Sequence, residues 1–208
     1  MSRRPLTTTS FAILGLLAIR PWATYDLAKL MRRSLHFFWP RAESNLYAEP
    51  KRLVAAGLAD VREEWNGDRR RTVYSITDRG QEALREWLTT PPADARVESE
   101  AHLRLLYANH GSKNDLLTAI QSIEDDAQKT IDHYMELLTE YARGEGLFPD
   151  RIHVNALVGS LSVEQARAAV RWTRWAREAV EGWRTTAKAD VEWATEAIRR
   201  AERETDGD

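Results

Sequence analysis

The feature that most constrains the fold of this chain is a β-hairpin signal in its first half. Asn66–Gly67 lies between two stretches that have the composition of strands, Leu58–Trp65 and Arg71–Ile76. An Asn-Gly pair between two such stretches is a strong signal for a tight turn between antiparallel strands. We therefore expect a hairpin over residues 58–76.

Three segments before the hairpin and one after it carry apolar residues at helical spacing. The first three span residues 7–19, 25–35 and 41–57. The fourth follows Thr77, which can cap it, and stops at the TTPP sequence of residues 89–92. Helix–helix–helix–strand–turn–strand is the order of a winged helix, whose third helix usually enters the major groove of DNA.

The third helix, RAESNLYAEPKRLVAAG from residue 41, has two different faces. At about 100° per residue, one side carries Leu46, Pro50, Leu53 and Gly57. The other side carries small, polar and cationic residues, namely Ser44, Ala48, Lys51, Arg52 and Ala55. An apolar stripe opposite such a face allows the helix to pack on a core and to approach a polyanion.

Pro50 lies in the middle of this helix, where a proline removes one hydrogen bond and costs roughly 3 kcal/mol. One interpretation is that the helix bends there and re-aims residues 42–47 relative to Lys51 and Arg52. The other is that Pro50 is the first residue of a shorter helix, a position where proline is well tolerated.

Three consecutive arginines, Arg69, Arg70 and Arg71, follow the turn. A run of arginines by itself is usually a solvated surface. At a hairpin tip beside a cationic helix, contact with phosphates is the better interpretation. Residues 1–90 carry a net charge of +5 and residues 91–208 a net charge of −7, which indicates an anionic partner at one end of the chain.

The second half has a different character. We expect a short helix at residues 98–110, one long helix at 113–143, a break at Gly144–Pro149, and helix again from 150 to about 203. The seam of the long helix has the narrow spacing of a coiled coil: Leu116, Ile120, Ile123, Ala127, Thr130, Tyr134, Leu137 and Tyr141. A helical hairpin that dimerises would bury such a seam. The predicted fold is therefore mainly α-helical, with a winged helix-turn-helix domain at 1–90 and an antiparallel, coiled-coil-like dimerisation domain at 91–208.

Several motifs occur in the order and at the spacing of a known family. AILGLLAI, then Tyr-Asp-Leu at 25–27, NLY, KRLVAAGL and VYSITDRGQEAL resemble the PadR family of bacterial transcriptional regulators over residues 7–88. DRIHVNALV and RWTRWAREAVEGW are similar to the family's helical dimerisation region. The resemblance implies a winged-helix homodimer that binds an operator, usually as a repressor, and is sometimes released by a small molecule. At the position of Pro50 the family usually has an apolar residue, often leucine.

The resemblance implies a set of DNA-binding residues: Tyr25 on the second helix, Arg41, Ser44, Asn45, Tyr47, Lys51 and Arg52 at the third, and Arg69, Arg70 and Arg71 on the wing. Asn45 and Ser44 are suited to base edges, although Ser44 could equally cap the helix. Lys51 and Arg52 are better suited to phosphates. Tyr47 and Tyr25 could each contact phosphate or pack against the protein.

Four of the eight tryptophans, Trp172, Trp175, Trp183 and Trp193, lie in the last helical region. A stripe of large aromatic residues at helical spacing is more often dimer core than a ligand site. The functional alternative is a flat pocket at the dimer interface, where a small aromatic or hydrophobic effector would stack.

Other classes of function find little support. The five histidines are scattered, and we see no metal-binding or catalytic motif and no phosphate loop, so we expect no enzyme activity, metal or cofactor. The absence of cysteine and the short apolar run Phe11–Ile19 fit a cytoplasmic protein without a membrane span. We expect a homodimeric regulator, a repressor by its resemblance, on a pseudo-palindromic DNA site. The alternatives are a winged helix that binds protein and a ligand sensor that has lost DNA binding.

Overall fold

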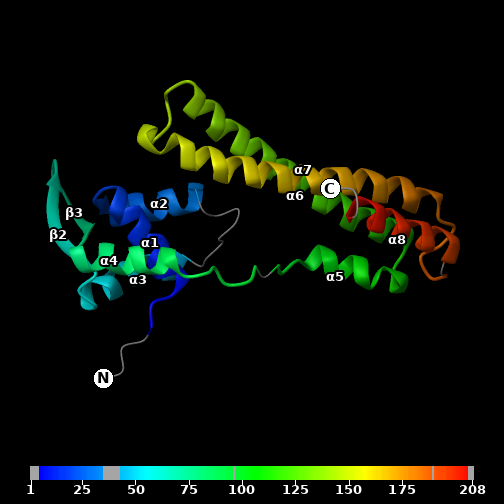
Figure 1. Ribbon diagram of the computed structural model, residues 1–208, viewed down its shortest axis with the longest axis horizontal. Coiled ribbons are helices and arrows are strands. Elements are labelled where there is room, and N and C mark those ends of the chain that lie inside the picture. Colours follow the sequence, from blue (N-terminus) through cyan, green and yellow to red (C-terminus); the bar gives the residue numbers. More distant parts are fainter. Residues whose placement is uncertain (1–4, 35–42, 96, 189, 206–208) are drawn as a thin grey trace. The chain divides into compact units, whose positions relative to one another are not determined.

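We describe a computed structural model of the chain, which covers residues 5–34, 43–95, 97–188 and 190–205 (Figure 1). The chain divides into two compact units, Met1–Ala95 and Arg96–Asp208. The described residues are mainly α-helical with one small antiparallel sheet, which confirms the predicted fold class. Within the described ranges, no helix combines the length and the hydropathy needed to cross a bilayer.

The first unit has the predicted order of helices and strands. Its elements are α1 (Thr8–Ile19), β1 (Trp22–Ala23), α2 (Thr24–Ser34), α3 (Glu43–Ala55), β2 (Ala59–Asn66), β3 (Arg69–Ile76) and α4 (Asp78–Thr89). The strand β1 was not predicted, because two residues after a proline carry too little pattern to be recognised. It pairs antiparallel with β3, so that the strand order in the sheet is β1-β3-β2.

The core of the first unit lies between its helices and the base of the sheet. Its largest fully buried apolar side chains are Ile13, Leu14, Leu17, Leu27, Pro50 and Leu53. The ring of Phe11 on α1 stacks on that of Trp87 on α4, with ring centroids 4.9 Å apart. Burial of these apolar side chains, contributed by the helices α1, α2 and α3, is the main favourable term that holds the unit together.

Thr77 connects the end of α3 to the start of α4. Its side chain accepts a hydrogen bond from the Gly80 backbone N–H (3.1 Å), which caps α4 as predicted, and its hydroxyl donates to the Gly57 carbonyl (2.9 Å). Gly57 has a φ of +72°, the left-handed conformation that commonly ends a helix. The chain can therefore leave α3 and enter the hairpin directly.

The hairpin turn lies one residue later than the sequence indicated. Asn66 pairs with Arg69, so the two-residue loop is Gly67–Asp68 rather than Asn66–Gly67. Gly67 has a φ of +59°, and Asp68 does not have a positive φ. This is the pattern of a type II′ turn, which requires glycine at its first central position. The correction places Trp65 opposite Arg70 and Glu64 opposite Arg71.

The helix α3 continues through Pro50, since its residues Glu43–Ala55 form one helix with the proline inside. The interpretation that Pro50 begins a shorter helix is therefore wrong. The ring of Pro50 is fully buried. Burial of the ring offsets part of the cost of the hydrogen bond that proline cannot donate.

The only secondary-structure elements in the described residues of the second unit are helices. Its elements are α5 (Glu100–Leu106), the 3-10 helix η1 (Ala108–His110), α6 (Lys113–Ala142), the 3-10 helix η2 (Pro149–Arg151), α7 (Ile152–Gly182) and α8 (Val191–Thr205). The long helix at 113–143 is confirmed. The single helix expected from 150 to about 203 is wrong, because the chain leaves the helical conformation at Trp183 and starts again at Val191.

Side chains at both ends of the break explain it. The Lys113 ammonium donates hydrogen bonds to the carbonyls of Glu181 (2.5 Å) and Trp183 (3.1 Å), which would otherwise lack partners at the end of α7. The Asp190 carboxylate accepts from the Trp193 N–H (3.0 Å) and caps the start of α8. The partner Lys113 lies about 70 positions earlier in the chain, so local sequence could not indicate this break.

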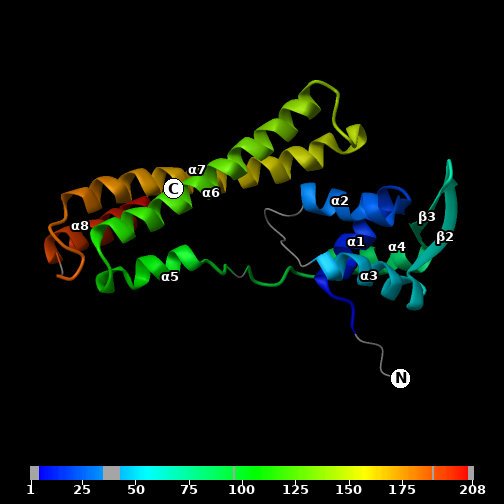
Figure 2. The same ribbon diagram turned by 180° about the vertical axis from the view of Figure 1, so that it is seen from behind.

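The helices α6 and α7 lie side by side along their lengths, as both views show (Figure 1 and Figure 2). One buried cluster joins Leu116 and Ile120 of α6 to Ala176 and Val180 of α7. A second joins Ala127 of α6 to α7 at Ala166 and Val170. The seam residues Leu116, Ile120 and Ala127 are therefore covered by α7 of the same chain.

Candidate nucleic-acid interface

The helix α3 presents the two faces that its sequence predicts. Pro50 and Leu53 are buried on one side, whereas Ala48, Lys51 and Ala55 are exposed on the other. Tyr47 is 40% exposed and stands at the edge of the exposed face. A cationic, largely small-residue surface is thus available on the outer side of this helix.

Arg52 differs from its neighbour Lys51, because it turns toward the protein. Its guanidinium forms an ion pair with the Glu49 carboxylate (Nη1–Oε2, 2.9 Å) and donates to the Pro5 carbonyl (Nη2–O, 3.3 Å). Glu49 is only 7% exposed and also accepts a hydrogen bond from the buried hydroxyl of Ser10. Arg52 therefore balances a buried carboxylate, a task that its sequence position did not reveal.

The remaining residues predicted for this helix can be placed only in part. Ser44 and Asn45 lie in the first turn of α3, and their side chains are outside the described part of the structure. Arg41 lies outside the described residues altogether. Tyr25, in the first turn of α2, is 65% exposed, so its alternative role as a core residue is wrong.

The arginines of the hairpin are paired with glutamates of the neighbouring strand. The Arg70 guanidinium forms an ion pair with Glu63, and that of Arg71 forms one with Glu64 (Nη2–Oε2, 3.0 Å). Glu64 also accepts from Arg62 of its own strand (Nε–Oε1, 2.7 Å). Arg69 lies in β3 opposite Asn66, and its side chain is outside the described part of the structure.

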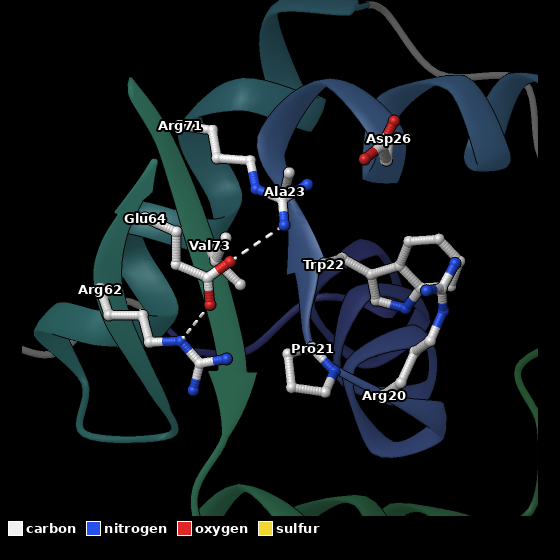
Figure 3. Close-up of a pocket in the computed structure, with 9 residues that line it drawn as sticks. All are labelled: Arg20, Pro21, Trp22, Ala23, Asp26, Arg62, Glu64, Arg71 and Val73. Atoms are coloured by element: carbon white, nitrogen blue, oxygen red, sulfur yellow. Dashed lines mark hydrogen bonds and ion pairs between the residues drawn. The ribbon is translucent and has the colours of Figure 1, made fainter. Parts of the chain in front are cut away.

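A cavity of about 260 Å³ lies beside these ion pairs, at the base of the hairpin (Figure 3). Glu64 stands between Arg62 and Arg71, and hydrogen bonds from Arg62 and then Arg71 lower the pKa of its carboxyl. On the other side of the cavity, the Arg20 guanidinium lies over the Trp22 ring, 3.8 Å from its centroid. Of the charged groups that line the cavity, Arg62, Glu64 and Arg71 are thus paired with one another.

Trp65 was not among the predicted site residues. It is 71% exposed, the largest exposed fraction of any tryptophan in the described ranges, and lies opposite Arg70 near the hairpin tip. The signal that could have identified it is its position next to the turn. Its cross-strand partner could not be read from the sequence, because the turn was expected one residue earlier.

The four tryptophans of the second unit form a packed group. Trp193 of α8 stacks on Trp175 of α7 (centroids 5.8 Å apart, planes at 21°) and meets Trp183 edge to face (4.9 Å, 78°). Trp172 lies 6.5 Å from Trp175 and is 39% exposed. Contacts between these rings therefore pack α8 against α7 within one chain. No group of three His, Asp or Glu side chains suited to a metal occurs among the residues that the structure describes.

Residues 13–86, which include α3 and the hairpin, match the transcriptional regulator PadR-like family. This part of the chain is a PadR-like domain. The resemblance of the N-terminal motifs to the PadR family is thus confirmed over residues 13–86. The match does not include the second unit.

A relative of known function agrees with the assignment of this domain. Over 121 residues the chain is 29% identical to the negative transcriptional regulator PadR of Bacillus subtilis (strain 168), a match that covers 57% of this chain and 65% of that protein. The matched part thus spans less than two thirds of that relative's length.

Solved structures share the fold of this chain over the PadR-like domain and into the second unit. The structure of Bacillus subtilis PadR in complex with operator DNA has a TM-score of 0.72 and 21% identity, and covers 84% of this chain and 99% of the other. The structure of the same protein with p-coumaric acid has a TM-score of 0.67, with equal identity and coverage. The matches extend into the second unit, and at 21% identity they show a shared fold alone.

Proposed function

We propose that this chain is a DNA-binding transcriptional regulator that acts as a homodimer and represses its target genes. The observation that carries the proposal is the PadR-like domain at residues 13–86, whose third helix has Lys51 and Tyr47 on its exposed face. The relative from Bacillus subtilis is named a negative regulator, and its structure was solved with operator DNA. By analogy, α3 enters the major groove and the hairpin lies along the flanking backbone.

Within this proposal, the residues divide by task. Ser44 and Asn45, at the start of α3, read base edges, since short polar side chains at the end of a recognition helix reach the groove floor. Lys51, Tyr47 and Tyr25 contact phosphates. Arg52 contributes to the position of α3 rather than to direct contact, because its guanidinium is held by Glu49.

The proposed dimer is supported by a second apolar face on α7. The buried side of α7 faces α6, and a row of exposed apolar residues lies beside that buried side: Val154, Leu157, Val158, Leu161 and Trp172. An exposed apolar row of this kind marks an interaction surface. A second copy of the chain, related by a two-fold axis, would cover it and would present two recognition helices to a pseudo-palindrome.

The DNA-binding proposal is tested by titrating the full-length protein with a labelled duplex from the promoter upstream of its own gene. Binding that survives competition by random-sequence DNA is expected. Failure to bind any duplex at low salt would instead favour a protein-binding winged helix or a ligand sensor without DNA binding. Light scattering tests the dimer: Leu157→Glu with Leu161→Glu should give monomers, whereas Ser160→Glu, elsewhere on α7, should not.

We also propose that a small aromatic effector binds near the tryptophan group. The Trp183 indole N–H is buried and has no acceptor among the described residues, so a ligand with an acceptor oxygen would satisfy it. The structural neighbour with p-coumaric acid supports this ligand class. Quenching of tryptophan fluorescence by aromatic acids, and release of DNA by the same compounds, are expected. No change in fluorescence across a broad panel would contradict the proposal.

A further inference from the structure

The hairpin carries no net charge, although three consecutive arginines follow its turn. From Ala59 to Ile76 it holds four acidic residues (Asp60, Glu63, Glu64 and Asp68) and four basic ones (Arg62, Arg69, Arg70 and Arg71). A wing that attracts DNA through phosphate contacts alone would be expected to have an excess of positive charge. The glutamates of β2 therefore need an explanation in a DNA-binding hairpin.

The fold places these glutamates directly against the arginines. Glu64 lies opposite Arg71 in the register, and Glu63 is two residues from the position opposite Arg70, which makes it a diagonal neighbour on the same face. Each of the two carboxylates forms an ion pair across the strands. Glu64 uses both of its oxygens, Oε1 toward Arg62 and Oε2 toward Arg71. The three described arginine side chains of the hairpin are thus all occupied by carboxylates.

These ion pairs remain open to exchange. The side chains of Arg70 and Arg62 are more than half exposed and that of Arg71 is 43% exposed, so a phosphate oxygen can reach each guanidinium. Exposed ion pairs contribute little to folding stability, because water and salt compete with them. Breaking them therefore does not threaten the fold, and an incoming phosphate can replace a carboxylate as the partner.

We propose that Glu63 and Glu64 are internal competitors of DNA phosphate, which occupy the wing arginines in the unbound protein and must be displaced when the wing binds. This inference rests on the proposed DNA-binding function. Its consequence is a weaker sequence-independent attraction of the wing for DNA. Because non-specific binding is electrostatic, the competition lowers it more than it lowers base recognition by α3, and so raises the ratio of specific to non-specific affinity.

The first test compares charge-neutral variants of the full-length protein on a random-sequence duplex over a series of salt concentrations. Glu63→Gln and Glu64→Gln should each raise affinity about threefold to tenfold at low salt and make the slope of log K against log salt steeper. Glu82→Gln is the matched control, since Glu82 forms an exposed ion pair with Arg85 on α4, outside the hairpin. It makes the same change in net charge and should alter affinity by less than about twofold.

A second test separates competition for the arginine from simple repulsion between glutamate and DNA. The Glu63–Arg70 pair is used, because Glu64 is shared between two arginines. If Glu63 acts by occupying Arg70, the gain from Glu63→Gln should disappear in an Arg70→Ala background. A gain of equal size in that background would overturn the inference, as would Glu63→Gln and Glu64→Gln affinities no higher than that of Glu82→Gln.

Failure of this inference can be distinguished from failure of the proposed function. The unaltered protein reports on DNA binding by itself, and an absence of binding to all duplexes would reject the function. If the unaltered protein binds but the glutamine variants gain nothing, only the competition is rejected. Circular dichroism of each variant confirms that the fold is retained before the affinities are compared.

Discussion

The hydroxyl of Ser10 on α1 donates a hydrogen bond to the carboxylate of Glu49 on α3, and both side chains are buried. The two residues are 39 positions apart in the chain. Arg52 balances the charge of this carboxylate from the next turn of α3. A buried carboxylate with these partners is costly to disturb, so the contact fixes how α3 sits on α1.

This relationship predicts different effects for two neighbouring cations. Arg52→Ala leaves the Glu49 carboxylate without its cation and should lower the free energy of unfolding by about 1–3 kcal/mol in urea titrations. Lys51→Ala removes an exposed cation, so stability should change by less than about 0.5 kcal/mol. Its effect should instead be on DNA, where the slope of log K against log salt falls by about 1. Equal urea midpoints for Arg52→Ala and the unaltered protein would contradict a stabilising role of the ion pair.

Pro50 is expected to shape sequence preference. As residue 50 has no N–H, the helical hydrogen bond to the carbonyl of Leu46 is missing. Pro50→Ala restores the donor and should change the path of the first turns of α3, including Ser44 and Asn45. Selection from a randomised duplex library should therefore yield a different preferred site. Binding to random-sequence DNA should change by less than about twofold, because phosphate contacts do not depend on base identity. An unchanged preferred site would reject the re-aiming role.

Two glycines of the first unit should respond oppositely to alanine. A Cβ at Gly80 would lie 2.1 Å from the Leu58 carbonyl oxygen and 2.8 Å from the Ile76 side chain, so Gly80→Ala must force α4 away from the sheet. A loss of about 2 kcal/mol or more is expected in thermal or urea unfolding. At Gly15, inside α1, an alanine methyl group would have only the backbone of its own helix within 4 Å, and Gly15→Ala should stabilise by about 0.5–1 kcal/mol. Similar stability of the two variants would refute the close approach of α4.

The attachment of α8 should depend on Trp193. Trp193→Ala removes both ring contacts, with Trp175 and Trp183, and should destabilise the second unit by about 1–3 kcal/mol. Loss of near-ultraviolet circular dichroism and faster hydrogen exchange in residues 191–205 should accompany it. Trp172→Ala is the control, because Trp172 is partly exposed and lies farther from its neighbour. Slow exchange in α8 of the Trp193 variant would show that other contacts hold the helix.

The start of α6 should contribute a pH-dependent term to stability. Hydrogen bonds from the Ser112 side chain and then its backbone lower the pKa of Asp115 below its ordinary value of 3.8. A carboxyl whose pKa is lower in the folded state stabilises the protein above the unfolded-state pKa, and this contribution is lost as pH falls through the folded-state value. Ser112→Ala should therefore lower the urea midpoint clearly at about pH 7 and less at about pH 3. An equal deficit at both values would assign the effect to the neutral part of the cap.

Local patterns in the sequence determined most of the helices, the predicted cap at Thr77, the hairpin and the two faces of α3. These features depend on residues a few positions apart, so periodicity and turn chemistry suffice to find them. The motifs of residues 7–88 also identified the family. The exposed positions of Lys51 and Tyr47 followed from the same helical spacing.

Only the tertiary structure decided which charged side chains are available. Arg70 and Arg71 pair with glutamates of the facing strand, and a one-residue shift in the turn was enough to conceal these cross-strand pairs. The partner of Arg52, Glu49, lies only one helical turn earlier, but its burial against Ser10 of α1 is a tertiary feature. The end of α7 likewise depends on Lys113, a residue of α6. The physical reason is that hydrogen bonds and ion pairs act over a few ångströms in space, whatever the separation of the two residues in sequence.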